Sequence, residues 1–92
     1  MAELLARLKI DLGIINSTAY DSRLSSLLEV AEKEIIREGA ATLDKTKLDD
    51  AELIIDYARW QWLGRREPTQ MPRELRYRLN NRIFAEKARG ET

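Results

Sequence analysis

The chain has 92 residues with no cysteine and no histidine, and its 16 basic and 16 acidic residues give a net charge of zero. One domain of this size buries only about 60% of the surface of its unfolded chain, so it is marginally stable alone and would gain from a partner subunit. The composition excludes disulfides and thiolate chemistry and removes the commonest metal ligand and general base. We therefore expect neither an enzyme, a cofactor nor a metal site.

The two parts of the chain carry opposite charge. Residues 1–56 hold seven Lys and Arg against twelve Asp and Glu, a net charge of −5, and residues 57–92 hold nine against four, a net charge of +5. Such a pattern suits head-to-tail association of identical chains. The apolar runs are too short to span a bilayer, and "MAELLARLKIDLG" carries acids where a secretion signal is basic, so we expect an intracellular protein without membrane contact.

Apolar residues recur at spacings of three and four, which predicts an all-α fold with no strand. We expect one domain over residues 1–92, built as a small bundle of about four helices. Their predicted ranges are 3–12, 20–38, 48–65 and 72–88.

The first two helices each bury one stripe. Gly13 and Gly39 end them, as glycine commonly does after a helix. In the second helix, Leu24, Leu28 and Ile35 follow the spacing of a single buried face, and we predict that they anchor the core.

The third helix carries apolar side chains on two nearly opposite sides. Leu48, Ile55 and Trp62 share one side and form a predicted core seam, whereas Leu53, Tyr57 and Trp60 share the other, because positions 60 and 62 differ by about 200° around the axis. Such a helix is either sandwiched within its own domain or uses its second face for a partner. The small size of the chain favours the partner.

The fourth helix follows a break at Pro68 and Pro72. Leu75 and Leu79 form its inner stripe and complete the set of predicted core anchors with Ile55 and Trp62. Its aromatic residues point away from those leucines, and its arginines flank them. We predict that a subunit interface uses the second face of the third helix and the outer surface of the fourth: Leu53, Tyr57, Trp60, Arg73, Arg76, Tyr77, Arg78 and Phe84.

The charged residues allow several interpretations. Arginines interleaved with aromatic rings could bind nucleic acid, although the acidic part of the chain would repel the same phosphates. They could equally pair with acids of their own chain, or with acids of the next chain. Asp56 and Arg59 have the spacing of a local ion pair. Asp44, Asp49 and Asp50 lack the spacing of a calcium loop and are expected to cap and charge the start of a helix.

Several ordered features resemble those of one protein family. They are "LLARLKIDLGI", "DSRLSSLLEVAEKEI", "LDDAELIIDYARWQWLGRRE" and, after the proline break, "MPRELRYRLNNRIF". Together they are similar to the small head-tail connector proteins of tailed bacteriophages, also called adaptor or DNA-packaging proteins. The exit from the third helix, with Trp62, the Arg65–Glu67 segment and the Met71–Pro72 pair, is the most characteristic part.

The resemblance implies a structural role in the virion. Subunits would form a ring, expected to be twelve-fold, beneath the portal protein, and the ring would extend the DNA channel without sequence-specific binding. A tail-side connector or stopper protein would dock on it. A small helical DNA-binding or packaging-associated protein, using the Arg-rich fourth helix, is the alternative.

Overall fold

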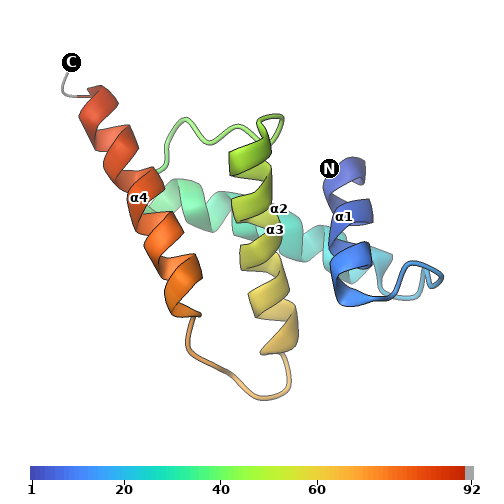
Figure 1. Cartoon of the computed structure of the whole chain (residues 1–92). Coiled ribbons are helices and arrows are strands. Elements are labelled where there is room, and N and C mark those ends of the chain that lie inside the picture. Colours follow the sequence, from blue (N-terminus) through green and yellow to red (C-terminus); the bar gives the residue numbers. More distant parts are fainter. Residues whose placement is uncertain (91–92) are drawn as a thin grey trace.

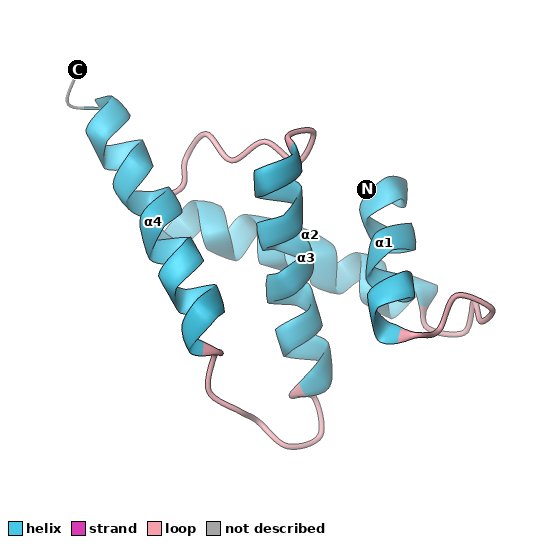
Figure 2. Cartoon of the chain, viewed as in Figure 1, coloured by secondary structure: helices cyan, strands magenta, loops and turns pink. Residues whose placement is uncertain are grey.

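The computed structural model describes residues 1–90, which form four helices joined by three loops (Figures 1 and 2). Helix α1 spans Ala2–Leu12, α2 spans Asp21–Glu38, α3 spans Leu48–Leu63 and α4 spans Arg73–Gly90. These described residues contain no strand. The predicted all-α fold is confirmed, and so is the number of helices.

Two helix boundaries differ most from the prediction. Helix α3 ends two residues early: the Gly64 N–H still makes the helical bond to the Trp60 carbonyl at 3.0 Å, but the Arg65 N–H donates to the Trp62 carbonyl, only three residues back, at 3.3 Å. The Arg65 guanidinium donates to the same carbonyl at 2.6 Å. Helix α4 continues to Gly90 and starts directly after Pro72, whose carbonyl accepts the Arg76 N–H at 3.0 Å. Proline suits this place because it has no N–H to leave unpaired.

Helix α3 lies at the centre of a flat molecule. Helices α1 and α4 flank it on opposite sides, and α2 crosses behind it (Figure 1). The Cα positions extend over 46 × 27 × 17 Å. None of the described helices is both long enough and apolar enough to cross a membrane.

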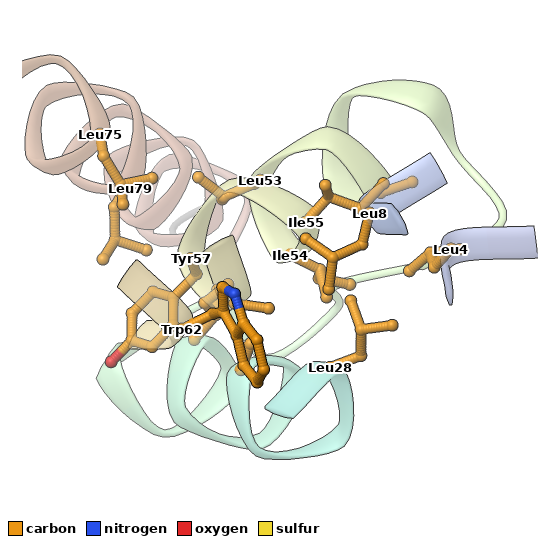
Figure 3. Close-up of a cluster of buried hydrophobic side chains, with 14 of the residues drawn as sticks. Leu4, Leu8, Leu28, Leu53, Ile54, Ile55, Tyr57, Trp62, Leu75 and Leu79 are labelled. Atoms are coloured by element: carbon orange, nitrogen blue, oxygen red, sulfur yellow. The ribbon is translucent and has the colours of Figure 1, made fainter. Parts of the chain in front are cut away.

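The core surrounds α3 on several sides. Figure 3 shows Leu75 and Leu79 of α4 on the side of α3 that carries Leu53, and Leu8 of α1 on the side of Ile55. The sandwiched arrangement is therefore the correct one, and the preferred assignment of the second face to a partner is wrong. The buried apolar residues of α3 are Ala51, Leu53, Ile54, Ile55, Tyr57, Ala58 and Trp62.

The predicted core anchors all lie in the interior, and Leu48 is the exception within the predicted seam of α3. Leu48 is 67% exposed because it begins α3 and helical side chains lean towards the N-terminus, so it extends past the end of the helix. Buried as predicted are Leu24, Leu28, Ile35, Ile55, Trp62, Leu75 and Leu79.

Candidate interaction surface on helix α4

Helix α4 joins the rest of the molecule through a narrow apolar stripe. Leu75 and Leu79 are buried and Ile83 is partly buried against the same core. Their counterparts on α3 are Leu53 and Tyr57 (Figure 3). These two α3 residues were candidates for a subunit interface, and the structure corrects that assignment because α4 of the same chain covers them.

Arg82 extends the α4 contact with a nearly buried ion pair. Its Nε donates to Asp50 Oδ1 at 2.9 Å, and its Nη2 lies 3.5 Å from Asp50 Oδ2. Asp50 Oδ2 also accepts the Asp44 N–H at 2.9 Å. One carboxylate thereby connects α3, α4 and the loop between α2 and α3.

Two further arginines of α4 pair with acids of the same chain. Arg76 Nη1 lies 3.1 Å from Glu38 Oε1 at the end of α2, and Arg78 donates to Asp56 of α3. The predicted Asp56–Arg59 pair does not form, because Asp56 turns towards α4. Arg76 and Arg78 were predicted as interface residues. They instead hold α4 in place by pairing with acids of their own chain, which was one of the interpretations that the sequence allowed.

The loop between α2 and α3 fastens the C-terminal half of α4 through Thr42. The Thr42 N–H donates to Glu86 Oε1, and the Thr42 hydroxyl lies 3.0 Å from Glu86 Oε2. The same hydroxyl oxygen accepts from Arg82 at 3.3 Å and from Arg89 at 3.2 Å. The hydrogen bonds from Thr42, followed by the charges of Arg82 and Arg89, hold the pKa of Glu86 below its usual value.

Trp60 lies half-buried beside the loop that leads to α4. Its ring meets that of Tyr57 edge-on with centroids 5.4 Å apart, and its Nε1–H donates to the Thr69 carbonyl at 3.2 Å. Burial, followed by the nearby charges of Glu38 and Glu34, raises the pKa of Tyr57. The chain itself thus covers most of Trp60, which is only partly exposed.

The side of α4 that faces away from the leucines remains uncovered. Tyr77 is 66% exposed and Phe84 is 72% exposed, and Arg73 lies on the same side because positions 73, 77 and 84 fall within about 40° around the helix axis. Exposed Asn80, Asn81 and Lys87 border them. We call these six residues the α4 outer face. It brings together three of the predicted interface residues: Arg73, Tyr77 and Phe84.

A second uncovered surface lies on α1 at the other end of the molecule, and sequence analysis did not identify it. Ile10 is 63% exposed and Ile15, in the following loop, is 58% exposed. Exposed Glu3 and Ala6 lie on the same side of α1 as Ile10, and exposed Asp11 lies on the flank beside it. We call these five residues the α1 outer face. The sequence does indicate this exposed apolar residue, because Ile10 falls about 200° from Leu8 around the helix axis and is outside the leucine stripe.

Asp49 and Asp50 charge the first turn of α3 as expected, but the predicted capping is wrong, because the N-cap residue is Lys47 and no side chain caps the helix. Asp44 accepts the Thr46 N–H at 2.9 Å and its hydroxyl at 2.6 Å, and these bonds lower the pKa of Asp44. In residues 1–90 no three His, Cys, Asp or Glu side chains are grouped so that they could hold a metal ion. The two outer faces can make apolar and ionic contacts with another protein surface.

Comparison of the chain with protein families, with characterised proteins and with solved structures finds no match.

Proposed function

We propose that this chain is a head-tail connector subunit of a tailed bacteriophage virion. Identical subunits form a ring beneath the portal protein, extend the DNA channel and give a tail-side connector or stopper protein its docking surface. The carrying observation is the α4 outer face, which leaves Tyr77 and Phe84 largely exposed on a helix that borders the molecule. Large exposed aromatic residues beside basic ones mark surfaces that another protein covers.

The internal contacts of the chain suit a mechanical role. Helix α3 contacts the three other helices, and ion pairs connect α4 to α2 and α3. A well-packed interior transmits strain and deforms little. A subunit of this kind can carry load between the head and the tail, because force on α4 reaches the core through both leucines and arginines.

The arrangement of the arginines gives less support to the DNA-binding alternative. Arg76, Arg78 and Arg82 hold carboxylates of their own chain, so binding a phosphate would require each to leave its partner. Free and strongly positive surfaces are what phosphate backbones attract. Arg73 and Lys87 of the α4 outer face remain, and they are few for an autonomous DNA-binding protein.

The proposal is tested by mixing the purified protein with the portal protein of the same phage genome and imaging the mixture by negative stain. We expect an added ring of density on one side of the portal. Binding of a fluorescent 20-base-pair duplex should be weak at moderate salt. A chain that leaves the portal bare, remains a monomer and binds the duplex tightly, with affinity that falls steeply as salt rises, would overturn the connector proposal.

A further inference from the structure

Resting on the proposed function, we infer which two surfaces join neighbouring subunits: the α4 outer face of one copy docks against the α1 outer face of the next. The two surfaces belong to helices that flank α3 on opposite sides, so they lie at opposite ends of the molecule (Figure 1). A contact between two different surfaces on opposite ends of a subunit is heterologous. Repeating such a contact produces a ring when the rotation closes, and a filament when it does not.

The two surfaces match in apolar character. Tyr77 and Phe84 expose their rings on α4, and Ile10 and Ile15 expose their aliphatic side chains at the α1 end. A ring packed on a branched aliphatic side chain removes apolar area from water on both sides. The docking therefore covers four of the most exposed large apolar residues in the described part of the chain.

The two surfaces also match in charge after the intramolecular pairs are subtracted. The cations of α1, Arg7 and Lys9, pair with Glu52 and Asp21, which leaves Glu3 and Asp11 as its acids. The mid-helix arginines of α4 are likewise engaged within the chain.

The α4 outer face therefore keeps Arg73 and Lys87, with Glu74 beside it at the rim of the groove that Asp56 lines. The α1 outer face keeps Glu3 and Asp11, and Glu3 likewise lies at the rim of a groove, the one that Lys45 lines. Residual positive charge on α4 thus faces residual negative charge on α1. Complementary charge of this kind steers association and fixes the register of a contact.

Charge disfavours the symmetric alternatives. Two α4 outer faces placed together would oppose Arg73 and Lys87 of both copies, and two α1 outer faces would oppose Glu3 and Asp11. Like charges set against each other at an interface cost free energy and suppress the wrong partner. The head-to-tail contact is the arrangement in which both the apolar and the charged residues find complements.

The contact is expected to be weak in isolation. Typical stable interfaces bury about 800 Å² on each partner, whereas each outer face carries only two large exposed apolar side chains. Assembly should consequently need high concentration or the portal as a template. A covalent trap is the suitable experiment, because it captures a contact that dissociates quickly.

Cysteine cross-linking tests the inference directly, since the natural chain contains no cysteine to give a background. The test protein carries Ile10→Cys and Tyr77→Cys in one chain and is treated with a short bismaleimide, both at high concentration and on the portal. We expect a ladder of dimers, trimers and larger species. Each single variant alone should give almost none, because two α1 or two α4 faces do not meet.

The control pairs Ile10→Cys with Leu63→Cys, an α3 residue of similar exposure at 59%, and it should give no ladder. Dimers from either single variant would overturn the head-to-tail contact in favour of a symmetric one. Rings on the portal that do not cross-link through positions 10 and 77 would overturn the contact and leave the connector function standing. A ladder in solution from a protein that never binds the portal would keep the contact and overturn the connector function.

Discussion

Asp50 is the one charged residue of the described chain that the fold buries, and it is 6% exposed. Its carboxylate accepts hydrogen bonds from Arg82 and from the Asp44 backbone. Removing one member of such a pair leaves the other charge poorly solvated, which costs more than the pair itself contributes.

Asp50→Ala should lower the free energy of unfolding by about 3 kcal/mol, measured by urea denaturation. Asp49→Ala is the matched control, because Asp49 lies in the same first turn of α3 but is exposed. Asp49→Ala should lower the free energy of unfolding by no more than about 1 kcal/mol, because it removes only the favourable interaction with the helix N-terminus that Asp50 also makes. Equal losses in the two variants would show that the bonds to Arg82 and the loop contribute nothing.

Glu86 makes the attachment of α4 sensitive to acid. Thr42 and the neighbouring arginines hold the pKa of Glu86 below its usual value of 4.5. A carboxyl group with a lowered pKa in the folded state stabilises the fold above its unfolded pKa, and that contribution is lost as the pH falls through the lowered value.

Thermal unfolding measured from pH 7 down to about pH 3 should therefore separate Glu86→Gln from the wild type. At pH 7 the variant should melt at a lower temperature, and the difference should shrink progressively below about pH 4.5, where the wild-type carboxylate takes up its proton. Glu29→Gln, at an exposed position of α2, provides the control. A gap between wild type and Glu86→Gln that stays constant across this range would contradict the role of the charged form.

At the scale of elements, the close approach of α4 to the end of α2 depends on a glycine. Gly39 has φ 138°, and a Cβ at this position would lie 2.9 Å from Ile83 Cγ2 of α4. Gly13, which ends α1 with φ 72°, has open space around the same position. Gly13 therefore has only a left-handed backbone, whereas Gly39 combines a more strained backbone with a close approach to α4.

Gly13→Ala should cost about 1 to 2 kcal/mol of unfolding free energy through the left-handed backbone alone. Gly39→Ala should cost a further ~1 to 3 kcal/mol, because a φ of 138° is more strained for alanine than the left-handed region and α4 must also shift away from the added methyl group. Chemical denaturation of both variants gives the comparison. Indistinguishable losses would mean that neither the backbone at position 39 nor the approach of Ile83 adds to the cost.

The elements themselves could be predicted from the sequence because their signals are local. Leucine spacing located the stripes of α2 and α4, and Gly13, Gly39 and Pro72 marked helix ends. The sequence did not show which other element covers each apolar face of a helix. Leu53 and Tyr57 were recognised as a second apolar face of α3, but their neighbour lies some 20 residues later, and periodicity does not show on which side α4 returns.

The candidate surface was predicted only in part, because some of its features follow from local helix geometry and others depend on contacts between helices. Tyr77 and Phe84 oppose the leucines of a single helix, so helical geometry alone placed them outside. The partners of Arg76 and Arg78 lie in α2 and α3, and only the folded chain brings them together. The exposed Ile10 was not predicted, because the leucine pattern of α1 indicates only the buried side of the helix.

At the scale of the whole molecule, folding neutralises most of the charge separation seen along the sequence. The acidic part and the basic part pack against each other through Glu38, Asp50 and Asp56. What remains at the two ends is modest: acids on the α1 outer face and cations on the α4 outer face. The charge that can act between molecules is therefore a property of the folded surface and differs from the −5 and +5 of the two sequence parts.

This distinction separates two arginines that lie one helical turn apart on α4. Arg76→Glu places a second acid beside Glu38, so it should lower the unfolding free energy of the single chain by roughly 1 kcal/mol. Combining it with Glu38→Arg should restore most of that loss. Arg73→Glu touches no such pair and should leave monomer unfolding within about 0.5 kcal/mol of the wild type.

In the cross-linking assay, Arg73→Glu should instead reduce the ladder formed by the Ile10→Cys, Tyr77→Cys protein, because it replaces attraction to the acids of α1 with repulsion. Adding Glu3→Arg and Asp11→Arg to the same chain reverses both surfaces and should recover the ladder. Recovery at low salt that disappears at high salt would mark the contact as ionic, since exposed pairs are screened. An undiminished ladder from Arg73→Glu alone would place the basic partner elsewhere on α4.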